Sequence, residues 1–433
     1  MSDLSIISPQ ILRTVGRLRA TTSETEVRLR MQPQTERPMP QRLRGECHAS
    51  RASIEALWSK LREMAPTTAA DQSVVADPQT LESADAYSAN IENMIGTVKV
   101  PVGVVGPLRI NGLHANGDFF VPLATTEAAL IASYARGAEI ASRAGGIAAA
   151  MLIEGVLRCP GFKFDSLIEA GLFIEWVTRS CAELKAAAEA TTRHGKLISI
   201  EPLMDNEIVF LGCRYTTGDA SGQNMVTIAT EALCRYIESH CPIRPKHWFI
   251  EVNFSGDKKS TYLGLITGRG RKVTASVVIP RALIEKHLHV GIDTILECAR
   301  MGSVGALLSG QIGAHGHYAN ALAAFYIATG QDAACVSEST AGFTRIEPRG
   351  EDLYVSVTLP NLLVGSVGGG TGLPSQSANL RLLGLQGPGK AAALAEVAAA
   401  LCLCGEMSII GAIAAGHFAR AHKKLARQRC RKC

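Results

Sequence analysis

The sequence predicts an α+β protein in which a small domain is inserted into a larger, mixed α/β domain. A chain of 433 residues is too long for one ordinary core, and its 47% hydrophobic and 19% charged residues are typical of globular proteins. Short β-rich runs and Ala-rich helical segments alternate on both sides of residues 160–250. Within that stretch a helix, two strands, a helix and a strand follow one another, which predicts a split-βαβ unit.

The net charge and the cysteines argue against several classes of protein. A net charge of +5 is mild for this length and gives no reason to expect a nucleic acid partner. The 12 cysteines are irregularly spaced, which argues against a disulfide framework and fits a reducing cytoplasm. Cys430 and Cys433 form a CxxC, but no second pair stands at zinc spacing, so we expect no metal site.

No apolar signal region stands at the start of the chain, so no secretory peptide is expected. The best candidate for a membrane span is residues 391–416, but Glu396 and Glu406 interrupt it and Ala and Gly dominate it. This segment is therefore predicted to be a buried or intersubunit helix instead of a membrane span. We expect a cytoplasmic protein.

The elements of the larger domain begin after a polar N-terminal segment. Residues 1–75 are rich in Arg, Thr, Gln and Pro and are expected to be flexible or partly helical, with SIEALWSKLREM (53–64) as the best helix. Gly and Pro punctuate short β-rich runs over residues 91–108, where the dense core begins. Residues 124–157 are Ala-rich, and their pattern favours a helix.

The sequence pattern of the inserted domain differs from that of the residues on either side. A charged helix (183–193) precedes the strands LISIEPL and EIVFLGCRY, the helix NMVTIATEALCRYIESH and the strand HWFIEV. We therefore assign residues 156–250 to the insertion and residues 76–155 and 261–425 to the larger domain. Residues 251–260 connect the two as a loop, and residues 426–433 form a basic tail.

Four polar sites stand in apolar or Gly-rich surroundings. Their members are Glu127 in PLATTEAAL, the triplet Asp257, Lys258 and Lys259 in VNFSGDKKST, Asp332 in GQDAA, and His417 and His422 in GHFARAHKK. Each alone is explained equally well as a helix cap, a solvated loop or a helix-end histidine. Together they supply a proton donor, a cation for an oxyanion, a tuning acid and an imidazole. That set suits the reduction of a carbonyl by hydride.

Hydride transfer needs a cofactor, and two Gly-rich loops could hold its phosphates. GSVGGGTGLPSQSANLRLLG (365–384) follows the strand LYVSVTLP and leads into a helix, and GDASGQN (218–224) also precedes a helix. Backbone N–H groups at such positions bind anions. Neither loop is a GxGxxG in a βαβ unit, so a Rossmann domain is not favoured, and an ordinary turn remains the alternative for each.

Taken together, these segments resemble the 3-hydroxy-3-methylglutaryl-CoA reductase family. The matching segments are ENMIG, VPVGVVGPL, PLATTEAAL, GDASGQNM, GDKK, the GQDAA run, VGGGTGLPSQ and GHFARAH, within residues 88–425. The chain is most similar to the NADP-using form of eukaryotes and archaea, without the membrane anchor of some members. The resemblance implies a large CoA-binding domain, an inserted ferredoxin-like NADP-binding domain, and a homodimer or dimer of dimers with its active site at the subunit interface.

The resemblance also assigns catalytic roles. Glu127 would donate a proton to the aldehyde intermediate, and Lys258 would polarise the thioester carbonyl and hold the oxyanion. Asp332 would lie between them and couple their pKa values. His422 would protonate the departing CoA thiolate. A glutamate in the apolar run around Glu127 would then be tolerated because a buried lysine and aspartate share its site, with a raised pKa.

The remaining site residues are carried over in the same way. Arg193 would meet the 2′-phosphate of the cofactor, which favours NADPH over NADH. The loops that would hold the cofactor contribute Asp219, Asn224, Gly368, Gly369 and Gly370. The substrate contacts would be Arg158, Glu251, Asp257, Lys259, Arg300 and Asn320, with Ser133 and Arg136 toward CoA.

Some positions depart from the family pattern. Ser221 and Gln223 stand in place of methionines, Cys335 and Val336 in place of Gln-Asn, Arg300 in place of lysine, and Glu251 where a serine is expected. Glu251 either faces the substrate's carboxylate or pairs with an arginine. Three functions therefore remain open: reduction of 3-hydroxy-3-methylglutaryl-CoA to mevalonate and CoA, reduction of another acyl thioester, or non-catalytic binding of a CoA ester.

Overall fold

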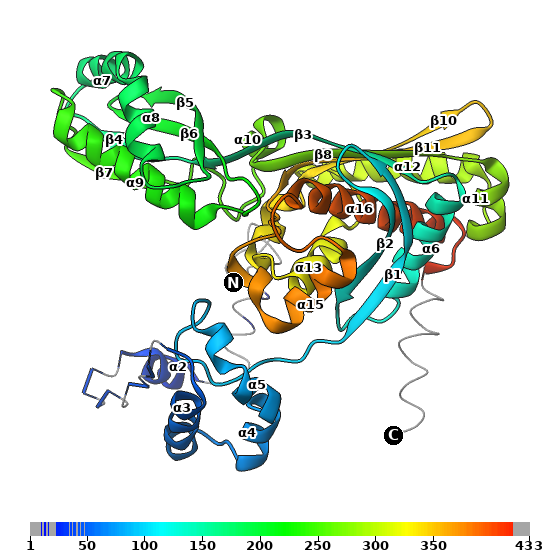
Figure 1. The fold of residues 1–433 in the computed structure, drawn as a ribbon, viewed down its shortest axis with the longest axis horizontal. Coiled ribbons are helices and arrows are strands. Elements are labelled where there is room, and N and C mark those ends of the chain that lie inside the picture. Colours follow the sequence, from blue (N-terminus) through cyan, green and yellow to red (C-terminus); the bar gives the residue numbers. More distant parts are fainter. Residues whose placement is uncertain are drawn as a thin grey trace, which may run out of the picture.

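The structure is a computed structural model that describes residues 48–418 without interruption. Among the earlier residues it describes positions 10, 13, 16, 23–33, 35, 36, 38, 39, 42, 43, 45 and 46. Figure 1 shows three parts: a large sheet packed with helices, a small sheet with its own helices to one side, and a helical unit formed by the N-terminal region. This mixed architecture confirms the predicted α+β class.

A large sheet forms the body of the described chain. Its strand order is β2-β1-β3-β8-β11-β10-β9. All neighbours are antiparallel except β1 with β3 and β9 with β10. The strands are β1 (Val102–Gly112), β2 (Asn116–Ala124), β3 (Ile147–Arg158), β8 (Gly270–Ile279), β9 (Gly313–Ala314), β10 (Gly342–Arg349) and β11 (Asp352–Leu362).

The helix α16 (Ala391–Ala414) is the core of this body. It packs against strands β3, β8 and β11 and is long and apolar enough to cross a membrane, yet 72% of its most apolar window is buried inside the protein. This confirms a buried helix. The helices α6 (Leu130–Arg143), α11 (Arg281–Leu288), α12 (Ile292–Ser309) and α13 (Tyr318–Thr329) pack against it. α10 (Tyr262–Thr267) packs against β11, and α15 (Pro374–Leu383) packs against α13 and β2.

The two glutamates of α16 hold neighbouring loops in place. The Glu396 carboxylate accepts hydrogen bonds from the backbone N–H groups of His114, Ala115 and Met151 at 2.7–3.0 Å. Glu406 accepts from the N–H groups of Gly316 and His317, both at 2.7 Å, and from the Thr344 hydroxyl at 2.8 Å. Because each buried carboxylate has three donors, its charge is tolerated inside an apolar helix.

The helical interpretation of residues 124–157 is only half correct. Residues 130–143 form α6, but IAAAMLIEGVLR forms strand β3, which pairs with β1 and β8. An alanine run fits either period, so the sequence pattern could not distinguish them. The residues form a strand because β1 and β8 pair with them on either side.

The small sheet has the order β7-β4-β6-β5, and all its pairs are antiparallel. The last residues of β3 (156–158) also pair with β6, so this one strand runs from the large sheet into the small one. The order confirms the predicted split-βαβ, ferredoxin-like arrangement. Its elements are β4 (Gly161–Lys163), α7 (Leu167–Arg179), α8 (Cys181–Glu189), β5 (Lys196–Asp205), β6 (Ile208–Thr216), α9 (Gln223–His240) and β7 (His247–Phe249).

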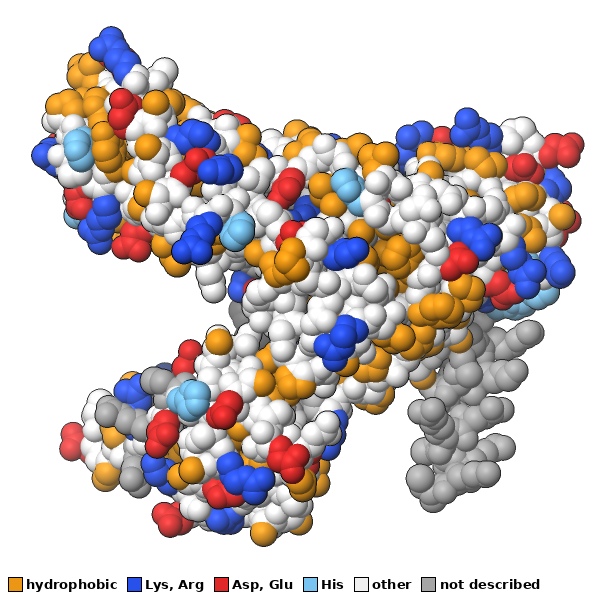
Figure 2. Space-filling view, viewed as in Figure 1, with side chains coloured by type: hydrophobic (Ala, Val, Ile, Leu, Met, Phe, Trp, Pro, Cys, Tyr) orange, Lys and Arg blue, Asp and Glu red, His pale blue; other side chains and the backbone are white. Residues whose placement is uncertain are grey.

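The N-terminal helices form a separate unit. They are α2 (Glu24–Met31), α3 (Arg51–Met64), α4 (Ala69–Val75), α5 (Pro78–Glu82) and the 3₁₀ turn η2 (Ala84–Tyr87). Ile54, Trp58 and Met94 belong to a small core of their own, distinct from that of the large body. In Figure 2 this unit and the small domain stand out as two lobes on one side of the body, with an open hollow between them.

Candidate active site

The predicted catalytic lysine lies in an irregular loop (residues 250–261) between β7 and α10. Its ammonium forms an ion pair with Asp332, with Nζ and Oδ2 3.0 Å apart. Asp332 caps the short turn η3 (Ala333–Cys335) by accepting the Ala334 N–H at 3.0 Å, which fixes its carboxylate. The structure therefore brings Lys258 and Asp332 together, as predicted.

Each member of this pair shifts the pKa of the other. The hydrogen bond to Asp332 raises the pKa of the Lys258 ammonium above its ordinary value. Partial burial alone would raise the pKa of Asp332, but hydrogen bonds from Lys258 and the Ala334 N–H outweigh it and hold that pKa below its ordinary value. Lys258 is therefore a cation over the whole neutral range, as a group that stabilises an oxyanion must be.

The loop supplies two members of an alternating row of five charged side chains, which we call the charge row: Glu251, Arg158, Asp257, Arg269 and Glu338. Arg158 Nη1 donates to Glu251 and to Asp257, at 3.1 Å in both cases. Arg269 Nη2 lies 3.0 Å from Asp257 Oδ1, and its Nη1 pairs with Glu338. Arg158 and Arg269 are buried, with exposed fractions of 6% and 1%.

The charge row answers the question about Glu251. Its carboxylate turns toward Arg158, so the pairing interpretation is the one the structure supports. Four buried atoms of the row have no hydrogen-bond partner among the described residues: Arg158 Nε, Glu251 Oε1, Asp257 Oδ1 and Arg269 Nη2. The last two lie close enough for an ion pair but not in hydrogen-bond geometry. We call Lys258, Asp332 and the charge row the lysine cluster.

A second cluster surrounds Glu127. The loop that precedes α6 turns through Ala129, whose φ of 74° is left-handed, and Glu127 faces a cavity of about 180 Å³. The same cavity is lined by Arg136, His317, Asn320 and His417, which come from α6, the start of α13 and the end of α16. We call these five residues the glutamate cluster.

The expected burial of Glu127 is wrong for this chain. Its side chain is exposed, and no hydrogen bond or ion pair among the described residues joins it to Lys258 or Asp332. Lys258 and Asp332 are also open to solvent, with side chains 46% and 40% exposed. The apolar run around Glu127 belongs to β2 and α6, whereas TTEAA between them lies at the surface.

The two residues predicted to face CoA are engaged with α16. Arg136 donates from Nε and Nη2 to Ser408 Oγ at 3.1 and 2.8 Å, and from Nη2 to its carbonyl at 2.9 Å. The hydroxyls of Ser133 and Ser408 are 2.9 Å apart. Burial lowers the pKa of Arg136. Arg136 also lines the Glu127 cavity, so its guanidinium both holds α16 and faces the site.

A buried tyrosine positions a histidine that the sequence analysis did not include. The Tyr134 hydroxyl is 2.9 Å from His317 Nδ1, and the His317 backbone is held by Glu406. Burial raises the pKa of Tyr134 well above its ordinary value, so its hydroxyl stays protonated. His317 lines the Glu127 cavity. A pair of histidines in the Gly-rich stretch GAHGHYAN was the available sequence signal.

The two predicted cofactor loops pack against each other. A Cβ on Gly365 would lie 2.5 Å from Ser221 N, and Asp219 O accepts the Ser366 N–H at 2.9 Å. Gln331 bonds both backbone groups of Gly365, which ties the Asp332 segment to the same place. Gly368 and Gly369 have φ of 74° and 54°, and a Cβ on either would meet nothing within 4 Å. This side of the loop is open to a ligand.

Two departures from the family pattern form one interaction here. Gln223 Nε2 lies 2.7 Å from Cys335 Sγ, which links the start of α9 to the turn after Asp332. Burial raises the pKa of the Cys335 thiol well above its ordinary value, so it is a thiol and not a thiolate. The cofactor loops are therefore connected directly to the lysine cluster.

The predicted cofactor residues occupy different parts of this region. Arg193 is exposed in the turn between α8 and β5, a turn that packs against the first residues of α9, since Thr192 Oγ1 donates to Met225 Sδ. Asn224 is exposed in the first turn of α9. The Asp219 carboxylate accepts the N–H groups of Gly389 and Ala391 at 2.7 and 3.1 Å. Asp219 therefore anchors the start of α16, a structural role that the sequence did not indicate.

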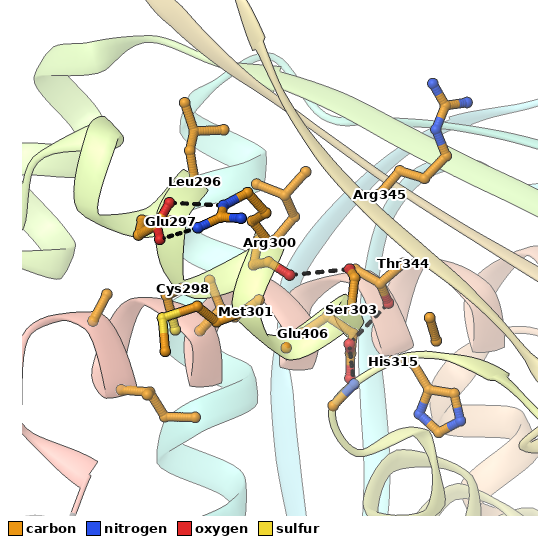
Figure 3. Close-up of a pocket in the computed structure, with 18 of the residues that line it drawn as sticks. Leu296, Glu297, Cys298, Arg300, Met301, Ser303, His315, Thr344, Arg345 and Glu406 are labelled. Atoms are coloured by element: carbon orange, nitrogen blue, oxygen red, sulfur yellow. Dashed lines mark hydrogen bonds and ion pairs between the residues drawn. The ribbon is translucent and has the colours of Figure 1, made fainter. Parts of the chain in front are cut away.

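Three further predicted residues belong to neither cluster: one lies apart, one borders the lysine cluster and one is outside the described residues. Arg300 lies on the exposed face of α12, where it pairs with Glu297 at 2.5–2.9 Å and borders a hollow of about 1050 Å³ (Figure 3). Lys259 is exposed, and its ammonium bonds the carbonyl of Asp257 at 2.9 Å. His422 and the basic tail lie outside the described residues.

Comparison with known sequences decides the family. The family model described as hydroxymethylglutaryl-coenzyme A reductase matches residues 54–427. The chain belongs to the hydroxymethylglutaryl-coenzyme A reductase family. The 3-hydroxy-3-methylglutaryl-coenzyme A reductase of Aeropyrum pernix is 45% identical over 353 residues, 80% of this chain and 84% of that protein. The reductase of Methanocaldococcus jannaschii is 42% identical over 79% of this chain and 86% of that protein.

Solved structures of this reductase family share the fold. The class II 3-hydroxy-3-methylglutaryl-CoA reductase of Streptococcus pneumoniae, bound to NADPH in open conformations, superposes with a TM-score of 0.63. Its sequence identity is 20%, and the match covers 83% of this chain and 96% of that one. The predicted resemblance to the reductase family is confirmed, and so is its oxidoreductase class.

Proposed function

We propose that this protein reduces 3-hydroxy-3-methylglutaryl-CoA to mevalonate and CoA with two molecules of NADPH, in the cytoplasm. The supporting observation is the Lys258–Asp332 pair, which stands beside two glycine loops. Each hydride adds to a carbonyl carbon, and the electron pair of the C=O bond moves onto oxygen. Reduction of the thioester releases thiolate, and reduction of the aldehyde gives the alcohol, so each turnover also consumes two protons.

Lys258 stabilises the oxygen anion in both reductions. Its ammonium is held by Asp332 and remains charged at neutral pH, so it presents a fixed cation to the developing negative charge. Arg158 keeps an unpartnered, buried Nε beside the same loop, which suits the free carboxylate of the substrate. Protons come from Glu127 to the aldehyde oxygen and from His422 to the CoA thiolate in this proposal.

The two clusters would meet across a subunit interface. Among the described residues of one chain, no hydrogen bond or ion pair joins Glu127 to Lys258, and Lys258 does not line the cavity that Glu127 faces. Both sets of side chains are open to solvent, as expected if a second copy closes the site. Glycine is plentiful in this chain, with 41 residues, and small residues allow helices of two subunits to approach closely.

The residues present fit NADPH. Arg193 is an exposed guanidinium next to the N-terminal end of the 18-residue helix α9, where backbone N–H groups favour a phosphate. Gly222 must be glycine there, because a Cβ would lie 2.2 Å from Thr217. Gly368 and Gly369 leave the opposite side open. The cofactor, when bound, supplies hydride, and Arg193 would hold its 2′-phosphate.

A mixing experiment tests the shared site. Lys258→Ala and Glu127→Gln homodimers should each be inactive with 3-hydroxy-3-methylglutaryl-CoA in an assay of NADPH oxidation. Unfolded and refolded together in equal amounts, half of the dimers would be mixed, and each mixed dimer would hold one intact site. The mixture should therefore recover about a quarter of wild-type activity. No recovery, with mixed dimers present, would place both residues in one subunit's site.

A second candidate substrate is favoured by one observation, the ion pair between Arg158 and Glu251. Because Arg158 Nη1 already serves Glu251 and Asp257, a substrate carboxylate would have to share the arginine with two others. An acyl-CoA without that carboxylate would avoid the repulsion. Turnover of a panel of acyl-CoA thioesters, with and without a terminal carboxylate, distinguishes the two substrates.

A further inference from the structure

The backbone of Lys258 adopts an unusual conformation. Its φ is 57°, in the left-handed region that side-chain-bearing residues rarely enter. The loop around it contains no helix or strand, but the Lys259 N–H donates to the Gly256 carbonyl at 3.0 Å and closes a turn around Lys258. A contact from outside the loop adds to this turn, and the direction of the Lys258 side chain depends on both.

A single buried carboxylate bonds this backbone. The Lys258 N–H donates to Glu338 Oε1 at 3.1 Å, from across a sequence separation of 80 residues. Glu338 lies in the short helix α14 (Val336–Ser339) and is 1% exposed. Its other oxygen pairs with Arg269, so its position is fixed from the opposite side. Glu338 is thus the last member of the charge row. Among the described contacts, it is the one member of the row that bonds the backbone of Lys258.

The segment that carries Glu338 also carries Asp332. Residues 332–339 therefore hold Lys258 at two points, the ammonium through Asp332 and the amide through Glu338. A third contact secures the neighbouring loop, since Ser260 Oγ donates to the carbonyl of Ser337. The segment itself is tied to the core, where the Tyr326 hydroxyl bonds Ser339 at 2.9 Å and Asn361 bonds the Glu338 carbonyl at 3.2 Å.

We propose that Glu338 is the positioning residue for Lys258: it holds the lysine backbone in its left-handed conformation and so aims the ammonium at Asp332 and the reacting oxygen. This inference rests on the proposed function for the identity of the reaction. The geometric part stands on the contacts of Glu338 alone.

The test uses the isosteric variant Glu338→Gln in the full chain. Lys258 N–H and Arg269 Nη1 are both donors, whereas a glutamine has one acceptor oxygen, so one of the two contacts must be lost. The charged Arg269 guanidinium is expected to keep its hydrogen bond to the glutamine oxygen. The NH₂ group of the glutamine side chain then faces the Lys258 N–H, and two donors repel each other. We expect kcat for the acyl-CoA to fall at least tenfold, with the KM for NADPH within twofold of wild type. Glu338→Ala should lower kcat at least as much.

Tyr326→Phe is the matched control. It removes a buried hydrogen bond from the same segment without touching Lys258, so it should lower Tm while leaving kcat within twofold of wild type. If Glu338→Gln behaves like Tyr326→Phe, with kcat preserved at a similar loss of Tm, the positioning role is overturned.

A second readout needs no substrate. The pKa of Lys258 can be measured by NMR of ¹³C-methylated lysines, with the signal assigned from Lys258→Arg. In Glu338→Gln it should fall toward its ordinary value, because the ammonium leaves Asp332, and in Tyr326→Phe it should not move. An unchanged pKa in an active enzyme overturns the inference. An inactive wild type whose pKa still falls in the variant would overturn the proposed function and support the positioning role.

Discussion

The lysine cluster and the glutamate cluster are built in opposite ways. Around Lys258, charged side chains from strand ends, loops and short turns neutralise one another in a row of ion pairs. Around Glu127, long helices supply the walls, and the key contacts are hydrogen bonds of hydroxyls and backbone amides. The difference teaches that one half of the site is positioned by charge balance and the other by helix packing.

Removing the cation should have the largest effect. We expect Lys258→Ala to lower kcat by about 10²–10³-fold or more, because the two arginines of the lysine cluster are buried and Lys258 is its one solvent-exposed cation. Folding should be intact, since the side chain is half exposed. Circular dichroism and size-exclusion chromatography provide the control. Turnover near the wild-type rate by the folded variant would remove Lys258 from the chemistry.

Cofactor selection should depend on a residue outside both clusters. Arg193→Ala should raise the KM for NADPH about tenfold to a hundredfold, the value of a charge-assisted bond to a phosphate, and leave the KM for NADH nearly unchanged. Lys196→Ala, at the start of β5 three residues later, is the matched control because its ammonium pairs with Glu189. A wild type that prefers NADH would contradict the role of Arg193.

Relieving the charge row at its exposed end should have a moderate effect. Two carboxylates about 4 Å apart repel by about 1 kcal/mol in water and about 4 kcal/mol at an effective dielectric of 20. Glu251→Ser should therefore lower the KM for 3-hydroxy-3-methylglutaryl-CoA about tenfold and leave that for an acyl-CoA without a carboxylate unchanged. Equal KM values for the wild type and the variant would mean that Glu251 does not compete with the substrate.

The smallest effect should come from the glutamate cluster. Tyr134→Phe removes one hydrogen bond to His317, worth about 1 kcal/mol, so aldehyde reduction should slow about fivefold. Tyr318→Phe also removes a buried tyrosine hydroxyl, bonded to Thr344 at 2.8 Å, but does not line the Glu127 cavity. It should leave the rate unchanged. If both variants slow the reaction equally, the effect is one of packing.

The sequence predicted the order of the elements better than their burial. The strands and helices of the small domain were predicted from their hydrophobic period and from the turn residues that flank them. Both signals are local, since each element spans only a short stretch of sequence. The exposure of Glu127 could not be predicted, since it depends on where the loop TTEAA leaves β2 and enters α6. Residues 147–158 were read as helix because alanine runs satisfy both periods, and only the neighbouring strands β1 and β8 decide between them.

The motifs predicted which residues belong to the site, but they did not predict the contacts between those residues. Lys258 and Asp332 were paired correctly because the family motifs contain both. The Glu251–Arg158 pair, the Glu338–Lys258 bond and the Gln223–Cys335 contact join residues 80–112 positions apart or lie on different elements. No local pattern encodes such pairs. Asp219 shows the same limit, since its carboxylate caps a helix that begins 172 residues later.

The path of the chain between the two sheets has a mechanical consequence. The chain enters the small domain through β3, a stiff strand shared by both sheets, and leaves it through β7, which leads directly into the loop of Lys258. A swing of the small domain relative to the body would bend the shared strand and pull on that loop at the same time. The position of the small domain and the direction of the lysine are therefore coupled mechanically through the backbone.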